Sequence, residues 1–130
     1  ARVLSTEHYR RGREADLSPV DLALGWGPMA DDAVVDALDI RQSGRFFFWR
    51  AESFPIPRRD IETHSANMHM IPASLEIDHR LRAVRAGDQI RLRGYLVRVA
   101  ASDGWQWRSS LTRDDTGAGA CELVLLESLH

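Results

Sequence analysis

The sequence predicts a single α+β domain, mainly β, built as a small bent antiparallel barrel with two or three short helices. Three observations predict it. The chain has 130 residues, the size of one domain, and residues 1–130 contain no linker or internal repeat. Strand and helix patterns follow one another along its length. One strand pattern changes phase at a glycine, which is typical of the bulges that bend barrel strands.

The N-terminal region predicts a strand, a turn and a helix. Residues 1–9 read as a strand and residues 10–14 as a charged turn. Ser18 suits the N-cap of a short helix, Pro19 suits its first position, and Asp21 suits its third.

A second helix and an aromatic strand follow. Asp31 or Asp32 can cap this helix, because helically spaced apolar residues occupy positions 34–38. Residues 40–52 predict one long strand with aromatic side chains on both faces, which indicates burial on both sides. Two prolines in residues 54–57 end it.

The middle of the chain predicts an extended segment and a third helix. Residues 61–71 read as mostly extended. Ser74 then suits an N-cap, and apolar residues recur at i, i+4 and i+7 as Ile77, Leu81 and Val84.

The last third predicts a three-strand meander. Apolar and charged residues alternate over residues 89–93, and the phase slips by one residue at Gly94–Tyr95, where we expect a bulge. Residues 102–104 predict a hairpin turn, 105–111 its returning strand, and 121–128 the final strand. Short bent strands with helices between them favour a closed barrel of the OB type, and the alternative is an open antiparallel sheet packed by helices.

Composition excludes several classes of protein. No apolar run is long enough to span a membrane. The formal net charge is −2, which argues against a dedicated nucleic-acid binder. All 17 basic residues are arginine, and the single Cys121 excludes an internal disulfide and a cysteine-based zinc site.

Because the chain begins directly in a predicted strand without a methionine, we expect a natural N-terminus upstream, and a removed signal or anchor segment would fit.

Several blocks of the sequence resemble a known family. They are residues 16–29 (DLSPVDLALGWGPM), 63–73 (THSANMHMIPA), 87–97 (GDQIRLRGYLV), 107–113 (WRSSLTR) and 119–122 (GACE). Together they resemble a proteobacterial family of exported or membrane-anchored proteins without an assigned activity. The resemblance implies a periplasmic or membrane-anchored location, and it implies no mechanism.

The extended segment separates into two faces by alternation. His64, Ala66, Met68 and Met70 fall on one face, and Ser65, Asn67 and His69 fall on the other. The second set predicts a buried hydrogen-bond network, with a binding patch as the alternative.

The face with His64, Met68 and Met70 permits soft-metal binding, because thioethers and imidazole suit Cu(I). We expect core packing and no metal instead, since methionine commonly fills gaps in cores. Met70→Leu should then change the free energy of unfolding by less than about 1.5 kcal/mol.

Two further alternatives carry chemistry. Cys121 with His64 or His69 as base would form a nucleophilic pair if the structure brings them within reach. Exposed aromatic residues at 46–49, Trp105 and Trp107 could stack the bases of a single strand beside nearby arginines (Arg91, Arg93, Arg98 and Arg108).

No complete catalytic motif occurs in the sequence, so we expect a non-catalytic binding or assembly domain of the bacterial envelope, without a cofactor. Its partner would be a protein or a small molecule. The candidate binding residues are Trp26, His64, Ser65, Asn67, His69, Trp105, Trp107 and Arg113.

Overall fold

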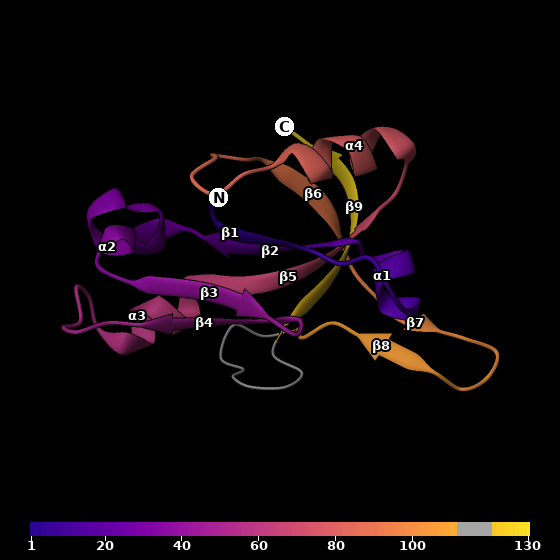
Figure 1. Ribbon diagram of the computed structural model, residues 1–130, viewed down its shortest axis with the longest axis horizontal. Coiled ribbons are helices and arrows are strands. Elements are labelled where there is room, and N and C mark those ends of the chain that lie inside the picture. Colours follow the sequence, from indigo (N-terminus) through magenta and orange to yellow (C-terminus); the bar gives the residue numbers. More distant parts are fainter. Residues whose placement is uncertain (112–120) are drawn as a thin grey trace.

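A computed structural model describes residues 1–111 and 121–130 (Figure 1). Its main sheet has the strand order β1-β2-β5-β9-β6. The bounds are β1 (Arg2–His8), β2 (Val20–Gly25), β5 (Ser65–Pro72), β6 (Leu92–Leu96) and β9 (Glu122–Leu129). β5 and β9 are parallel, whereas the other neighbours in this sheet are antiparallel. The predicted α+β class, mainly β, is confirmed, but the expectation of a wholly antiparallel sheet is wrong because β5 and β9 are parallel.

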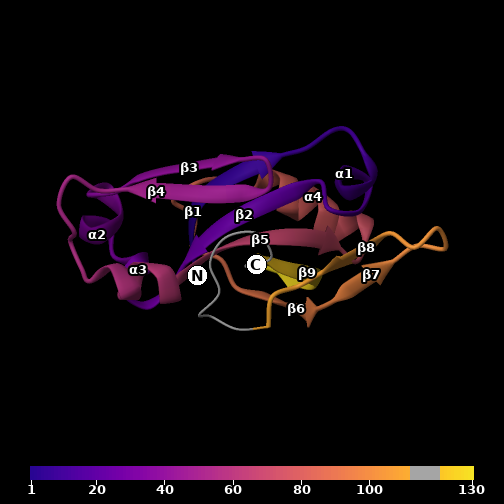
Figure 2. The ribbon, with the colours of Figure 1, turned by 90° about the horizontal axis from the view of Figure 1, so that it is seen from below.

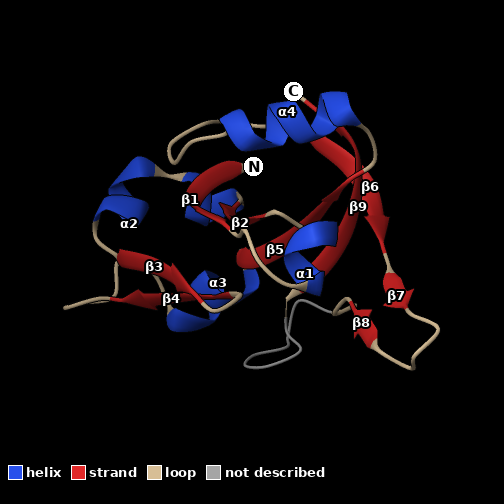
Figure 3. Cartoon of the chain, turned by 45° about the vertical axis from the view of Figure 1, so that its right-hand side comes forward, coloured by secondary structure: helices blue, strands red, loops and turns tan. Residues whose placement is uncertain are grey.

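Two hairpins form separate two-stranded sheets outside the main sheet (Figure 3). The first pairs β3 (Asp39–Ser43) with β4 (Phe46–Arg50), and the second pairs β7 (Arg98–Ala100) with β8 (Gln106–Arg108). The helical elements are α1 (Arg13–Leu17), the 3₁₀ turn η1 (Gly27–Ala30), α2 (Asp32–Asp36), α3 (Arg58–Thr63) and α4 (Leu75–Ala83). None of the described helices has the length and apolar character needed to cross a membrane.

Apolar cores lie on both faces of β2, whose six residues are all buried. Leu22 and Leu24 belong to the first core, which also holds Leu81 from α4. Ala23 points to the second core, which is covered by the β3–β4 hairpin, η1, α2 and α3. Figure 2 shows this hairpin above β1 and β2, on the side away from β6. A polar side chain on the second face of β2 is therefore removed from water.

The edge strands β1 and β6 do not form a ladder with each other among the described residues, so a closed barrel is not established. The segment that leads into β6 nevertheless contacts β1. The Val3 amide donates to the carbonyl of Asp88 at 2.8 Å, and the Gly87 amide donates to the carbonyl of Val3 at 2.8 Å. An isolated bridge joins Arg2 to Gln89.

The predicted three-strand meander is wrong, because β6 and β9 pair in the main sheet whereas β7 and β8 form a separate hairpin. Two predicted elements are also wrong. The helix expected from Ser18 is strand β2, because a strand covered on both faces has a continuous apolar run instead of alternation. The single strand expected over residues 40–52 is the β3–β4 hairpin, whose side chains alternate between half-buried and exposed.

Two boundaries also differ. The charged turn expected over residues 10–14 contains the start of α1, and the extended segment expected from residue 61 begins with the end of α3.

Several local predictions are confirmed. The Asp31 side chain accepts a hydrogen bond from the Ala33 amide at the start of α2. Ser74 caps α4 by accepting from the Ile77 amide. The pairing of β6 with β9 shifts register between Arg93 and Gly94, one residue before the expected bulge.

Candidate functional site

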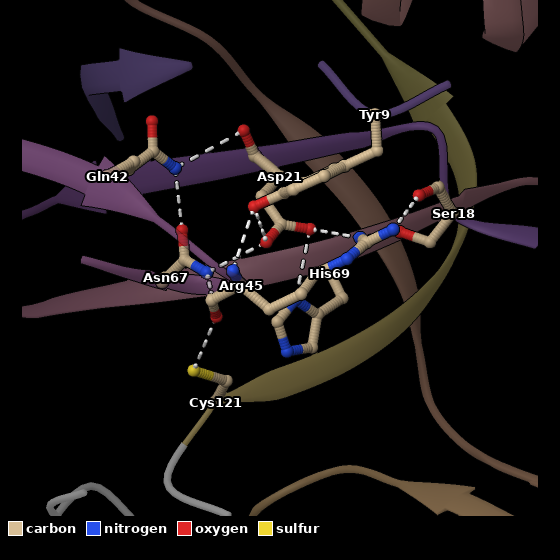
Figure 4. Close-up of polar contacts among 8 residues, drawn as sticks. All are labelled: Tyr9, Ser18, Asp21, Gln42, Arg45, Asn67, His69 and Cys121. Carbon is tan, nitrogen blue, oxygen red and sulfur yellow. Dashed lines mark hydrogen bonds and ion pairs between the residues drawn. The ribbon is translucent and has the colours of Figure 1, made fainter. Parts of the chain in front are cut away.

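A group of polar side chains lies between the sheet and the β3–β4 hairpin (Figure 4). We call it the Asp21 cluster, and it consists of Tyr9, Ser18, Asp21, Gln42, Arg45, Asn67, His69 and Cys121. Asp21 on β2 is at its centre, with a side chain that is fully buried. A buried carboxylate is costly unless it is paired and hydrogen-bonded, so the surroundings of Asp21 decide what the cluster does.

Sheet register places His69 beside Asp21. The two residues are direct partners in the antiparallel pair of β2 and β5. Nδ1 of His69 lies 3.0 Å from Oδ1 of Asp21. This contact is an ion pair when the imidazole is protonated.

Arg45 neutralises the same carboxylate from the hairpin turn. Its Nη1 donates to Oδ1 of Asp21 at 2.7 Å, and its Nη2 donates to the carbonyl of Ser18 at 2.8 Å. Its guanidinium carbon lies 3.7 Å from the centre of the Tyr9 ring, a cation–π contact. Arg45 therefore ties the turn of the hairpin to the loop between β1 and β2.

Asn67 connects the carboxylate to both sides of the hairpin. Its Nδ2 donates to Oδ2 of Asp21 at 3.0 Å and to the carbonyl of Arg45 at 2.9 Å. Its Oδ1 accepts from Nε2 of Gln42 at 2.7 Å. Strand β3 and the turn of the hairpin are thus both held by an amide on β5.

Tyr9 completes the coordination of the carboxylate. Its hydroxyl donates to Oδ2 of Asp21 at 3.2 Å and accepts from the Arg45 amide at 3.0 Å. Burial raises the pKa of Tyr9 well above its usual value, and the charge of Asp21 adds to this rise. The phenol therefore remains a neutral donor.

His69 carries charge within the cluster. Burial opposes that charge, but contacts with Asp21 and Cys121 outweigh it and raise the pKa of His69 to about 9. Its ring also packs against Trp107, with ring centres 5.0 Å apart. At neutral pH the ring is an imidazolium, which balances the buried carboxylate together with Arg45.

Cys121 lies just before β9 and is partly exposed. Its Sγ lies 3.6 Å from the carbonyl oxygen of Arg45. Figure 4 places the thiol beside the His69 ring, on the side away from Asp21. Of the two histidines that the sequence offered as partners for Cys121, the structure selects His69.

The two predicted tryptophans of the last third extend the cluster outward. Trp105 and Trp107 have ring centres 6.3 Å apart, and Arg13 stacks on Trp105 at 4.9 Å. Arg13 also pairs with Asp103, and this hydrogen bond lowers the pKa of Asp103. These contacts join α1 to the β7–β8 hairpin.

The remaining predicted residues lie elsewhere. His64 follows α3, where its Nδ1 lies 2.8 Å from the carbonyl of Asp60. The Ser65 hydroxyl donates to the carbonyl of Ile61 at 2.6 Å. Trp26 is half-buried against the first core. Arg113 lies outside the described residues.

The two methionines of β5 pack with the first core. Met70 is fully buried and Met68 is partly buried. The soft-metal alternative requires both methionines and His64 on one accessible face. Met70 is not accessible, so this set of ligands is not available. No described set of three or more His, Cys, Asp or Glu side chains is placed to hold a metal ion.

The outer face of the β3–β4 hairpin is aromatic. On β4, Phe46 is 37% exposed and Phe48 is 55% exposed. Phe54, beyond the end of β4, is also 55% exposed and packs against Trp49. The rings of Phe46 and Phe48 lie 6.5 Å apart. Two shallow hollows of about 390 and 300 Å³ adjoin Phe48, and arginines line both: Arg50 borders each of them, with Arg58 in the larger and Arg41 in the smaller.

The centre of the site is not recognisable from the sequence pattern. That pattern predicts a helix at Asp21, and it does not distinguish Tyr9, Gln42 or Arg45 from other polar residues. One sequence feature does indicate the site: Asp21 is the single acid inside the apolar run of residues 20–24. An acid is rarely buried unless it is paired, so an acid in such a run indicates a buried ion pair.

Comparisons with known proteins identify no relative. The chain matches no protein-family model, no curated protein and no solved structure.

Proposed function

We propose that this chain is a non-catalytic binding domain of a bacterial envelope protein, and that it binds a protein partner through the outer face of the β3–β4 hairpin. The observation that carries the proposal is the exposed aromatic surface of Phe46 and Phe48 on β4, with the exposed Phe54 just beyond the end of that strand. Exposed aromatic side chains on a fixed element are typical of interfaces.

The Asp21 cluster supports the proposal because it fixes the hairpin in place. Arg45 in the turn and Gln42 in β3 both contact groups on the main sheet. A hairpin of two strands is marginally stable by itself in water. Held from beneath, it presents Phe46 and Phe48 in a defined orientation, which lowers the entropy cost of binding.

We also infer an OB-like barrel from the strand order. The sheet has a parallel pair between β5 and β9, with α4 following β5, and the Val3–Asp88 contact joins its two edges. OB folds bind ligands on the face of their second and third strands, which here are β2 and β5. The hairpin covers that face, so its own outer surface takes the place of the usual binding surface.

The charges around the aromatic surface favour an acidic partner segment with apolar side chains. Arg41 and Arg50 have side chains that are 75% and 83% exposed. Both lie near Asp39, which compensates one of the two charges. Arginine beside aromatic side chains is the composition of interface hot spots.

The test is site-specific photo-crosslinking in the native bacterium, with a photoreactive phenylalanine at position 48 of the full protein. The matched control places it at Tyr95, a 60% exposed aromatic residue on β6. We expect a discrete protein adduct in the envelope fraction from position 48 and none from position 95. Equal adducts from both positions, or none from position 48, would refute the proposal. A nucleic-acid adduct would favour the single-strand alternative instead.

A second test compares two variants, each with a crosslinker at position 54. The first carries both Phe46→Ser and Phe48→Ser, and the second, its matched control, carries Tyr95→Ser. We expect the adduct to disappear in the first variant and to persist in the second. Near-ultraviolet circular dichroism of the tryptophans verifies that each variant is folded.

A further inference from the structure

Three titratable side chains of the Asp21 cluster come from adjacent strands. Asp21 is on β2, His69 is on β5, and Cys121 immediately precedes β9, the order in which these strands lie in the sheet. His69 is between the other two: its Nδ1 faces Asp21 at 3.0 Å, and the opposite side of the ring faces Cys121. A thiol, an imidazole and a carboxylate in this spatial order form the arrangement that activates nucleophilic cysteines.

The environment of Cys121 also has the properties of a reactive thiol. Reactive cysteines lie in partly exposed, electropositive surroundings, whereas buried structural cysteines are inert. Cys121 is partly exposed. The His69 side chain is only 7% exposed, so its charge is poorly screened where it meets the sulfur. The guanidinium of Arg45 packs on Trp107, whose ring also contacts His69, and adds a second cation to this region.

We propose that Cys121 is a reactive thiol that undergoes thiol–disulfide exchange with small disulfides, with His69 and Asp21 as positioning residues. This site uses the inner side of the cluster, whereas the proposed partner surface is on the outer face of the hairpin. The exchange does not require a partner on that outer face, although Asp21 also helps to hold the hairpin.

The exchange is balanced without a further co-reactant. The thiol of Cys121 gives its proton to solvent, and the resulting thiolate pairs with the His69 imidazolium. The thiolate attacks one sulfur of the small disulfide, a new S–S bond forms, and the original S–S bond breaks. The departing thiolate takes a proton from solvent. The sulfur of Cys121 is oxidised to a mixed disulfide, and the departing sulfur is reduced to a thiol.

The first experiment compares the folded chain with the same chain unfolded in urea. The probe is a nitrobenzoate disulfide whose released thiolate is coloured, and the rate is followed at pH 6 and at pH 9. We expect the folded chain to react about tenfold faster than the unfolded chain at pH 6, with a smaller ratio at pH 9. Mass spectrometry should find one adduct, on Cys121. A folded chain that reacts no faster than the unfolded chain at pH 6 would overturn the proposal.

The second experiment tests His69. His69→Gln should lower the rate at pH 6 about tenfold and make its pH profile resemble that of the unfolded chain. The matched control is His79→Gln, which changes an exposed histidine on α4 and should keep the rate of the unaltered protein. An unchanged rate in folded His69→Gln would contradict the assignment. If His69→Gln does not fold, the comparison of folded and unfolded chains decides the proposal.

Discussion

Arg45 shows how one residue is held in an unfavourable backbone conformation. Its φ is 74°, in the left-handed region, and the preceding Gly44 has a φ of 59°. Two positive φ values in succession are typical of the tight turns that join hairpin strands. A residue other than glycine adopts this conformation at a cost of about 1–3 kcal/mol. The ion pair with Asp21 and the stacking on Tyr9 offset that cost.

Replacing Arg45 should therefore destabilise the protein strongly. Arg45→Met keeps the length of the side chain but leaves the buried carboxylate of Asp21 with only His69 as a charged partner. We expect the free energy of unfolding to fall by about 3–5 kcal/mol, as for other broken buried ion pairs. Urea denaturation measures this change. Arg50→Met, on the exposed face of β4, should change it by less than about 0.5 kcal/mol.

His69 should make stability depend on pH on the alkaline side. Its pKa is raised to about 9 in the folded chain, against an ordinary value near 6.5. Because the folded chain holds this proton more tightly, the stabilisation is fully present below pH 6.5. It is lost as pH rises through 9. The contribution of His69 to the free energy of unfolding that is lost in this way is of the order of 3 kcal/mol.

The measurement is urea denaturation at intervals between pH 6 and pH 9.5. His69→Gln should flatten the curve, whereas the exposed His79→Gln should keep it. A stability that is constant between pH 6.5 and pH 9 in the unaltered protein would contradict the raised pKa of His69.

At the scale of elements, local sequence signals succeed where the cause of the structure is local. Asp31 and Ser74 cap helices because their side chains reach an amide two or three residues onward. These signals are readable from residues beside each other in the chain. The helices α2 and α4 were predicted for this reason.

The failures have non-local causes. The run of residues 20–24 forms a strand because the sheet covers one of its faces and the hairpin the other. The turn at Gly44–Arg45 was missed because arginine is not a usual residue for a left-handed turn position. Its partner Asp21 is 24 residues away in the sequence. No local sequence pattern predicts such a contact.

The bulge in β6 requires a glycine at position 94. A Cβ atom added to Gly94 would lie 2.3 Å from the carbonyl oxygen of Leu125. Gly94→Ala should therefore push β6 away from β9 and reduce the free energy of unfolding by about 1–3 kcal/mol. Thermal or urea denaturation measures the loss. Arg93→Ala, an exposed neighbour, should remain within about 0.5 kcal/mol of the unaltered protein.

At the scale of the molecule, the sequence predicted part of the candidate site. Alternation along β5 placed Ser65, Asn67 and His69 on one face, and all three are buried polar residues. The charged partners of Asn67 and His69 come from β2 and from the hairpin turn. Those elements meet β5 only after the chain has folded, so their contribution was not predictable.

The contact between β1 and the segment before β6 joins the two edges of the sheet. Val3 is fully buried in the first core, and its amide and carbonyl are both bonded to that segment. Separating the edges would expose this core, so we expect them to open only with global unfolding. In native-state hydrogen exchange, the amides of Val3 and Gly87 should be protected as strongly as that of Met70 in β5.

The β7–β8 hairpin supplies the internal comparison. The Gly104 amide bonds only within its own turn, to the carbonyl of Ala101, and should exchange much faster because that hairpin can open locally. Gly87 has a φ of 94°, so Gly87→Ala strains the connecting segment. This variant should speed exchange at Val3 more than at Met70, because the edges then separate without complete unfolding. Exchange at Val3 as fast as at Gly104 in the unaltered protein would show that the two edges are not joined in solution.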